Sequence, residues 1–478
     1  MRSSLRRYLV STPAARPRRR ARAKAIDVLE AVQAPSAPPA ELSWHDYAVF
    51  LLHVASEIEH ALMVQYLYAA YSLGGANLAG TRHENARQWR EVILGIAKEE
   101  MGHLITVQNI LRLIGGPLHL EREDYPFRSD FYPFHFLLEP LTKNSLAKYV
   151  VAEAPEDWLD TKEGKEVVER AAKADDGRQI VRVGMLYELL VEVFGNEGAL
   201  TDEDFRADTA PYQASWDEWA RGYGAGERGN IGQESPKRTP DVLVIPAADR
   251  AGVVDALQQI ARQGEAPAGR GADTPEESHF KRFLKIYKVF PERNPPSRNI
   301  PTNPTTQPPQ EGDADGEGPT VCSPITNTHS MLWANLFNVR YRKLLFTLKH
   351  AFHVQAGDAV DRPTARGNLI SWTFGEMYNL RSIAAILVTL PLNDGGGDER
   401  AGPPFSVPYT LALPDWDSDK WRVHRDLIAA AETLIHQLDE DPDEAQHAYL
   451  RALRDHDRQT LEVVERLLTG AEQQEANA

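Results

Sequence analysis

Residues 44–73 read WHDYAVFLLHVASEIEHALMVQYLYAAYSL, and this stretch decides the fold. It is apolar around nearly its whole circumference and contains no proline or glycine, which predicts a long helix surrounded by other helices. Burying an unpaired charge costs free energy, so the few polar residues of this helix need partners inside the protein. These residues are His53, Glu57, Glu59, His60 and Gln65. The stretch therefore predicts a helical bundle with polar groups in its core.

The sequence on either side of this stretch is also helical in pattern. A second helix is predicted over 84–114, because Gly115-Gly116-Pro117 is typical of a helix end. One short strand is expected at 242–245, and helical periodicity recurs at 161–193, 248–262, 274–289, 331–354, 371–392 and 426–468. The fold class is therefore mainly α, with long irregular insertions between the helices.

Composition divides the chain into four segments. Residues 1–40 are basic and rich in Pro and Ala, and predict a flexible leader. Residues 41–290 hold the helical domain, and residues 326–478 hold a further helical region. Between them, 291–325 is rich in proline and has no apolar pattern, so it predicts a linker or a draped loop.

Charge and cysteine content exclude several classes of protein. The 478 residues are 42% hydrophobic and 26% charged, which is ordinary for a globular protein with a real core. The single cysteine, Cys322, excludes a disulfide framework and a zinc site built from several thiolates. The net charge is −16, but the first 24 residues carry nine basic residues and no acid, so the rest of the chain is near −25 and offers a poor surface for nucleic acid. With no run of about 18 apolar residues, we expect a cytoplasmic protein without a membrane span.

Glu-x-x-His pairs are the motif that carries chemistry. Residues three apart share one face of a helix, so such a pair offers a carboxylate and an imidazole to the same ion. Di-iron carboxylate bundles take their ligands in this pattern from several helices. The sequence has four such pairs: Glu57/His60, Glu100/His103, Glu276/His279 and Glu444/His447.

The sequence context separates these pairs. Glu100 and His103 lie in the middle of an apolar helix, where packing alone does not explain them and metal ligation is favoured. Glu57 and Glu59 are two residues apart and cannot face the same way, so at most one of them is a ligand. The pair at 444–447 lies in an acidic segment that is typical of a solvated surface.

Several longer motifs accompany the pairs. They are EIEHA at 57–61, QYLYAAYS at 65–72, EEMGH at 99–103, GGP at 115–117, QGE at 263–265, SHF at 278–280, FN-x-x-Y-x-x-LL at 337–345 and AGPPF at 401–405. Together they resemble the ferritin-like domain of the iminophenyl-pyruvate dimer synthases of the violacein and rebeccamycin pathways, and of their stand-alone relatives. The resemblance spans about residues 45–410 and implies a ferritin-like four-helix bundle with an additional C-terminal helical region.

The resemblance also implies a set of metal ligands. It selects Glu59 rather than Glu57, and it favours Glu265 over Glu276, whose acid is also explained by its place at a helix start. The implied set is Glu59, Glu100, His103, Glu265 and His279.

The third helix departs from the family pattern. The family tends to carry a Glu in a Gly-Glu-x-Tyr stretch, but here Gly184 is followed by Met185. Glu188, one turn on, is the substitute that we expect, and Glu192 is a further candidate. The site is left with three alternatives: two ions, one ion, or a degraded site.

The function that the resemblance implies is an oxidoreductase with two metal ions, acting with dioxygen or peroxide on a small, aromatic, amino-acid-derived metabolite of natural-product biosynthesis. Carboxylates and imidazoles suit Fe, with Mn as the alternative, and no motif supports haem. We expect a small-molecule substrate, a homodimer or a biosynthetic partner enzyme, and no nucleic-acid or membrane partner. The alternatives are a protein that handles metal or peroxide, and a scaffold without catalysis.

Overall fold

The computed structural model describes residues 38–39, 41–75, 78–127, 129, 131–215, 242–265, 277–307, 322–355, 365–395, 397–407, 411–439 and 444–477. The predicted leader therefore lies almost wholly outside the described residues. Within these ranges the regular secondary structure is helical, apart from one parallel pair of two-residue strands, β1 (Pro304–Thr305) and β2 (Ser323–Pro324). The mainly α class is confirmed, although the segment 242–245, expected to be a short strand, has no regular secondary structure.

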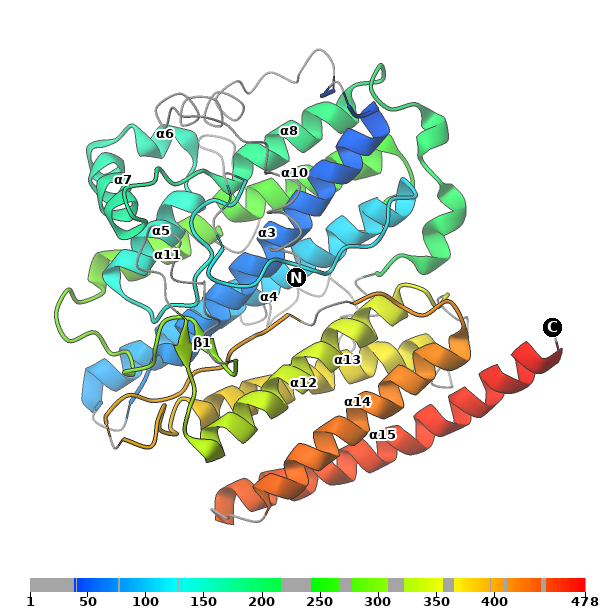
Figure 1. The fold of residues 1–478 in the computed structure, drawn as a ribbon. Coiled ribbons are helices and arrows are strands. Elements are labelled where there is room, and N and C mark those ends of the chain that lie inside the picture. The colour runs from blue at the N-terminus through cyan, green and yellow to red at the C-terminus, as the bar shows by residue number, and fades with distance from the viewer. Residues whose placement is uncertain are drawn as a thin grey trace, which may run out of the picture.

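Two pairs of helices form the bundle (Figure 1). The first pair is α3 (Trp44–Ser72) against α4 (Gly80–Leu113), and the second is α8 (Val183–Gly195) against α10 (Arg250–Glu265). Ser43 begins α3 with a capping box, because its hydroxyl accepts from the backbone N–H of Asp46 while the Asp46 carboxylate accepts from Ser43. The predicted helices at 44–73, 84–114 and 248–262 are confirmed to within a few residues.

Helix α3 is the centre of the core. By length and composition it could cross a membrane, but 61% of its most apolar window is buried inside the protein. Its buried polar groups have internal partners, as expected: His60 Nδ1 lies 2.9 Å from the carbonyl oxygen of Leu120, and Gln65 donates to Ala61. The helix is therefore a core helix of the bundle.

Shorter elements surround one end of the bundle (Figure 1). The stretch 161–193, predicted as one helical segment, is two helices separated by a turn in which Gly177 has a φ of 78°. The elements at this end are α5 (Lys143–Ala152), α6 (Glu156–Leu159), α7 (Lys162–Ala174) and α11 (His279–Val289). The short helices η1 (Asp202–Asp204) and η2 (Ala207–Tyr212) lie at the other end, near the C-terminus of α4, where Arg206 donates its backbone N–H to Leu113.

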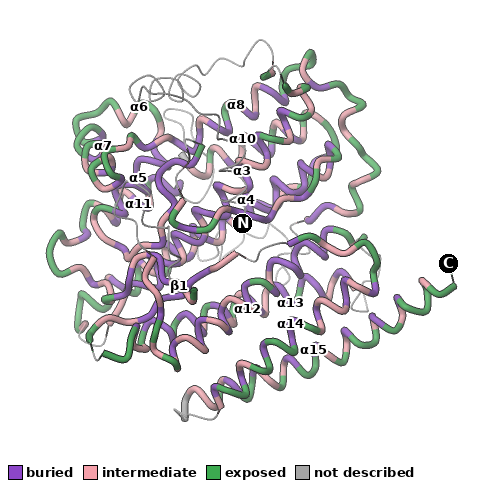
Figure 2. Tube along the Cα trace, viewed as in Figure 1, coloured by how far each residue is buried: buried purple, intermediate pink, exposed green. Residues whose placement is uncertain are grey.

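Four long helices form the C-terminal region. They are α12 (Thr328–Ala351), α13 (Ala365–Leu387), α14 (Asp417–Leu438) and α15 (Glu444–Asn477). The single helix predicted over 426–468 is wrong, because α14 ends at Leu438 and α15 begins at Glu444. Both helices lie side by side at the edge of the molecule, and the C-terminal half of α15 is largely exposed (Figure 2).

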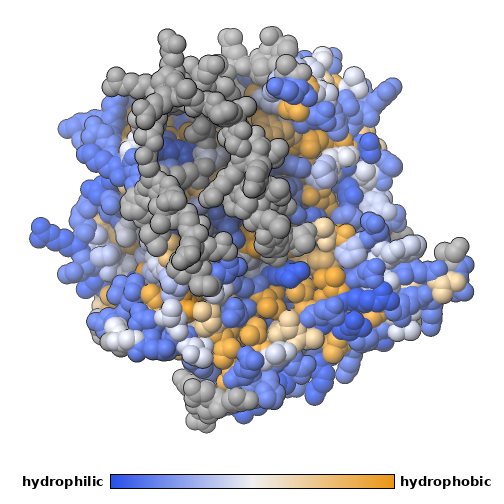
Figure 3. All heavy atoms as spheres, in the orientation of Figure 1, coloured by the Kyte–Doolittle hydropathy of each residue, from blue (hydrophilic) through white to orange (hydrophobic). Residues whose placement is uncertain are grey.

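The proline-rich segment lies against the bundle where the structure describes it. Arg298 donates its backbone N–H to Ser72, Asn303 exchanges hydrogen bonds with Leu138, and Ile300 is buried. One hydrophobic cluster extends from Tyr47 in α3 to Leu453 in α15. The face shown in Figure 3 is mostly hydrophilic, with an apolar area toward its lower centre.

Gly102 is required where α4 meets the extended segment 242–245. A Cβ atom at this position would lie 2.7 Å from Val242 Cγ1 and 2.9 Å from the backbone nitrogen and oxygen of Leu243. Gly102→Ala is therefore expected to lower the free energy of unfolding by about 1–3 kcal/mol, measured by urea denaturation. Gly470→Ala is the control, because a Cβ there meets open space in a helix and is expected to add about 0.5–1 kcal/mol.

A buried charge cluster joins α12, α13 and α15. Arg340 and Lys343 pair with Glu376 and Asp457, and each of the four side chains is at most 4% exposed. Burial alone would raise the pKa of Glu376, but Lys343 and Arg340 lower it to about 2. The lowered pKa predicts a pH-dependent contribution of Glu376 to stability.

Because its pKa is lower in the folded chain than in the unfolded chain, ionised Glu376 stabilises the fold fully above about pH 5. This stabilisation is lost as the pH falls from about 4.5 toward 2. Glu376→Gln is therefore expected to destabilise the protein by about 3 kcal/mol at pH 6 and by much less near pH 2.5, in urea titrations at each pH. A difference that grows on acidification would contradict this assignment.

Candidate metal centre

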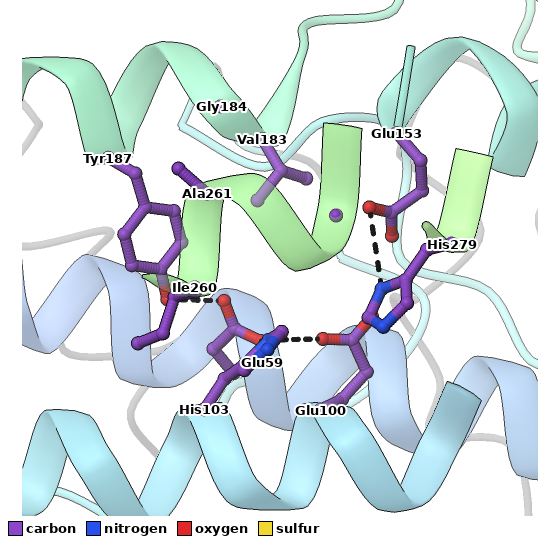
Figure 4. A pocket seen from close by; sticks show the side chains of 11 residues that line it. Glu59, Glu100, His103, Glu153, Val183, Gly184, Tyr187, Ile260, Ala261 and His279 are labelled. Atoms are coloured by element: carbon purple, nitrogen blue, oxygen red, sulfur yellow. Dashed lines mark hydrogen bonds and ion pairs between the residues drawn. The ribbon is translucent and has the colours of Figure 1, made fainter. Parts of the chain in front are cut away.

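Two sets of carboxylates and imidazoles converge inside the bundle. The first set is Glu59, Glu100 and His103, and the second is Glu100, Glu153 and His279. In each set, one ligand atom per residue lies within 4.8 Å of the others, and all five residues are buried. Glu100 belongs to both sets, and Figure 4 shows it between the two histidines.

The distances connect the two sets through Glu100. His103 Nδ1 lies 2.9 Å from Glu100 Oε2 and 3.2 Å from Glu59 Oε2. On the other side, His279 Nδ1 lies 3.1 Å from Glu100 Oε1 and 3.7 Å from Glu153 Oε2. The two carboxylate oxygens of Glu100 therefore face different histidines, as in a carboxylate that bridges two cations.

Helix ends place the second set. Glu153 is the C-cap of α5, and the helix stops there because Pro155 follows within two residues. His279 is the first residue of α11, and the hydroxyl of its N-cap, Ser278, accepts from the backbone N–H of Lys281. Both side chains thus extend from fixed helix ends toward Glu100 in α4.

Four of the five residues of the centre, all but Glu100, have an outer partner. Tyr187 donates to Glu59 Oε1, and Tyr66 donates to Glu153 Oε1 at 2.6 Å. The outer nitrogens of the histidines are also engaged: His103 Nε2 lies 2.8 Å from Gln263 Oε1, and His279 Nε2 lies 2.7 Å from Glu99 Oε2. Such partners leave the two Nδ1 atoms as the ones that face the centre. Arg282 pairs with Glu99 behind His279.

Two buried atoms test whether a cation fits. Glu100 Oε1 and His279 Nδ1 are both buried and form no aligned hydrogen bond, although they lie 3.1 Å apart. Buried polar atoms of this kind need an explanation, and a cation that both atoms coordinate supplies one. The donor set of carboxylates and imidazoles suits Fe or Mn.

The balance of charge also favours cations. Four buried carboxylates, Glu59, Glu99, Glu100 and Glu153, gather here with one guanidinium, Arg282. Burial and the neighbouring Glu100 raise the pKa of Glu59 to about 8. Burial would lower the pKa of His103, but Glu59 and Glu100 raise it to about 10. A metal ion that binds these groups would therefore compete with protons for them and release protons.

A small cavity opens beside these residues (Figure 4). Its volume is about 10 Å³, which is room for roughly one water molecule. Apart from the candidate ligands and Tyr187, its walls are the side chains and backbone of Val183, Gly184, Ile260, Ala261 and Gly264. The cavity thus admits a ligand of a few atoms at the centre.

Four of the six predicted ligands lie at the centre: Glu59, Glu100, His103 and His279. Glu188 does not, because its side chain is 44% exposed on α8 and pairs with Arg182. The alternative Glu192 does not line the cavity either. Helix α8 contributes the hydroxyl of Tyr187 instead.

The remaining predictions concern residues near the end of α10. Glu265 is the last residue of that helix, but its side chain lies outside the described residues, as does the whole of Glu276. Glu57, which the resemblance rejected, faces away from the centre and pairs with His119 at 3.0 Å. The sequence reasoning missed Glu153, whose signal is only an acid at a helix end before Ala-Pro.

Comparison with known proteins agrees with the helical fold. Residues 52–288 match the ferritin-like family model. Dichlorochromopyrrolate synthase of Lentzea aerocolonigenes is 25% identical over 73% of this chain and 35% of its own length. The 2-imino-3-(indol-3-yl)propanoate dimerase of Chromobacterium violaceum is 24% identical over 78% of this chain and 35% of its own length.

The chain thus spans about a third of the length of these two relatives. The crystal structure of a ferritin-like protein from Caulobacter vibrioides aligns with 71% of this chain and 96% of its own, at 17% identity and a TM-score of 0.41. The predicted resemblance is confirmed at the level of the domain: residues 52–288 carry a ferritin-like domain, and the chain is similar to these two enzymes.

Proposed function

We propose that this chain is a metal-dependent oxidoreductase with two cation positions, acting with dioxygen or peroxide on a small, aromatic, amino-acid-derived metabolite. The observation that carries the proposal is the shared carboxylate of Glu100, which belongs to two buried ligand sets at once. The substrate class rests on the names of the two relatives, which are a dichlorochromopyrrolate synthase and an indolyl-propanoate imine dimerase.

The residues that would hold the cations are Glu59 and His103 on one side, Glu153 and His279 on the other, and Glu100 between them. Bound Fe or Mn supplies open coordination positions and redox chemistry toward dioxygen or peroxide. The chain's own contribution is to fix the ligands. Tyr187 and Tyr66 orient the two outer carboxylates by donating hydrogen bonds to them.

The residues that line the cavity also keep water away from the centre. Val183 and Ile260 place apolar side chains beside the carboxylates, so bulk water is excluded and the electrostatic interactions of the centre are strong. The cavity holds roughly one water molecule, so a small oxidant reaches the centre more readily than an aromatic metabolite does. This size favours a second candidate function, the turnover of peroxide without an organic substrate.

The proposal includes a cellular setting. The enzyme acts in the cytoplasm on a small molecule, and it works as a homodimer or beside a biosynthetic partner enzyme.

Metal analysis of the purified full chain tests the proposal. After loading with Fe²⁺ or Mn²⁺ and removal of free metal, about two ions per chain are expected, whereas less than about 0.2 would favour the scaffold. Dioxygen uptake is then measured with and without an aromatic amino acid or its imine. Uptake that depends on the organic compound supports the oxidoreductase, while turnover of bare peroxide alone supports the second candidate.

A further inference from the structure

The centre has two halves, which are the ligand set of Glu59, Glu100 and His103 and the ligand set of Glu100, Glu153 and His279. Their carboxylate ligands have equivalent hydrogen-bond partners. Glu100 serves both halves, and each outer carboxylate accepts a hydrogen bond from a buried tyrosine hydroxyl. Tyr187 donates to Glu59, and Tyr66 donates to Glu153. The carboxylate ligands therefore give the two halves no obvious difference in strength.

The two halves differ behind their imidazoles. His103 Nε2 meets the neutral amide oxygen of Gln263 at 2.8 Å, whereas His279 Nε2 meets a carboxylate oxygen of Glu99 at 2.7 Å. A carboxylate that accepts from the outer N–H of a histidine raises the basicity of its inner nitrogen, and an amide does so much less. His279 Nδ1 is therefore the stronger donor atom of the two.

Glu99 is held in this role by its own contacts. Its side chain is fully buried, and both of its oxygens accept from the guanidinium of Arg282. Arg282 lies one turn after His279 on the same face of α11, so one short helix supplies both partners of Glu99. The two N–H groups of the Arg282 guanidinium keep the Glu99 carboxylate ionised and hold it in place beside His279 Nε2.

We propose that the position between Glu100, Glu153 and His279 binds a divalent cation more tightly than the position between Glu59, Glu100 and His103, and that Glu99 is the positioning residue that sets the difference. This inference rests on the proposed metal centre. It means that the two positions fill in order, the His279 side first. It also means that a singly loaded form of the protein exists at low metal concentration.

Titration of the metal-free full chain with Mn²⁺ tests the order. Free Mn²⁺ is read from its solution electron paramagnetic resonance signal, so no activity is needed. Two binding steps are expected, with dissociation constants at least about tenfold apart. Glu99→Gln keeps the size of the side chain but removes its charge, and is expected to weaken only the tighter step, by about 10–100-fold.

Gln263→Glu is the reciprocal variant. It places a carboxylate behind His103, and is expected to tighten only the weaker step, by about tenfold. Because it leaves Glu99 and Arg282 unchanged, it decides the matter alone if circular dichroism shows that Glu99→Gln does not fold. A role of Glu99 in folding only would weaken both steps together, and would leave the Gln263→Glu variant no tighter than the wild type.

The outcomes distinguish a failure of the proposed metal centre from a failure of the inferred binding order. If the wild type binds no Mn²⁺, the proposed centre itself is wrong. If it binds two ions in equal steps, or if Glu99→Gln weakens the weaker step, the centre stands and the order inferred from Glu99 is overturned.

Discussion

Glu100→Ala is expected to remove bound metal from both positions and to abolish turnover. Every other candidate ligand serves one position, but the two carboxylate oxygens of Glu100 face His103 on one side and His279 on the other. Alanine removes both oxygens and leaves a cavity in a helix that is otherwise well packed. Metal content measured after loading with Fe²⁺ should fall below about 0.2 ions per chain.

Glu57→Ala is the matched control for Glu100→Ala. Glu57 is also a helical glutamate near the centre, but it lies on the opposite face of α3 from Glu59 and pairs with His119 and Tyr132. The metal content of the Glu57→Ala variant is expected to stay at the wild-type level. Equal losses in the two variants would mean that the substitutions act through stability and that Glu100 is no bridging ligand.

The contrast between Glu57 and Glu59 shows how much of the candidate site can be predicted from the sequence. Helical periodicity says that the two acids face different ways, but it does not say which of them faces the centre. That depends on where the neighbouring segments pack: Glu57 meets His119, and Glu59 meets His103 of α4. The apolar length of α3 and the glycine-proline end of α4 were predictable because they are local properties of the sequence.

Glu153 shows what local patterns leave out. It has no histidine three residues away, and it comes from the end of α5, which packs against α11 beside the bundle. His279 formed a local motif with Glu276, yet its partners in space are Glu99, Glu100 and Glu153. Ligands that meet through tertiary packing leave no spacing in the sequence, and this is also why the sequence favoured Glu188, which the structure places on the exposed side of α8 beside Arg182.

Arg340→Met is expected to lower the free energy of unfolding by about 3–5 kcal/mol, because it leaves a buried carboxylate without its partner. Arg340 is fully buried in α12 and contacts both Glu376 of α13 and Asp457 of α15. Without it, Lys343 alone faces two negative charges. Urea denaturation measures the loss. Arg454→Met is the control, since Arg454 pairs with Asp439 near the surface, at a side-chain exposure of 37%, where solvent screens the pair and a much smaller loss is expected.

The double variant Arg340→Met/Asp457→Leu separates lost charge pairing from lost packing. It removes one charge of each sign and leaves Lys343 and Glu376 paired at 2.8 Å. If uncompensated charge causes the damage, the double variant is expected to recover most of the stability that Arg340→Met loses, because apolar replacements of buried ion pairs are often neutral. If packing of the long side chains causes it, the two losses add, and the double variant is less stable than either single one. Recovery would therefore identify the uncompensated buried charge, and not the lost packing of Arg340, as the cause of the lost stability.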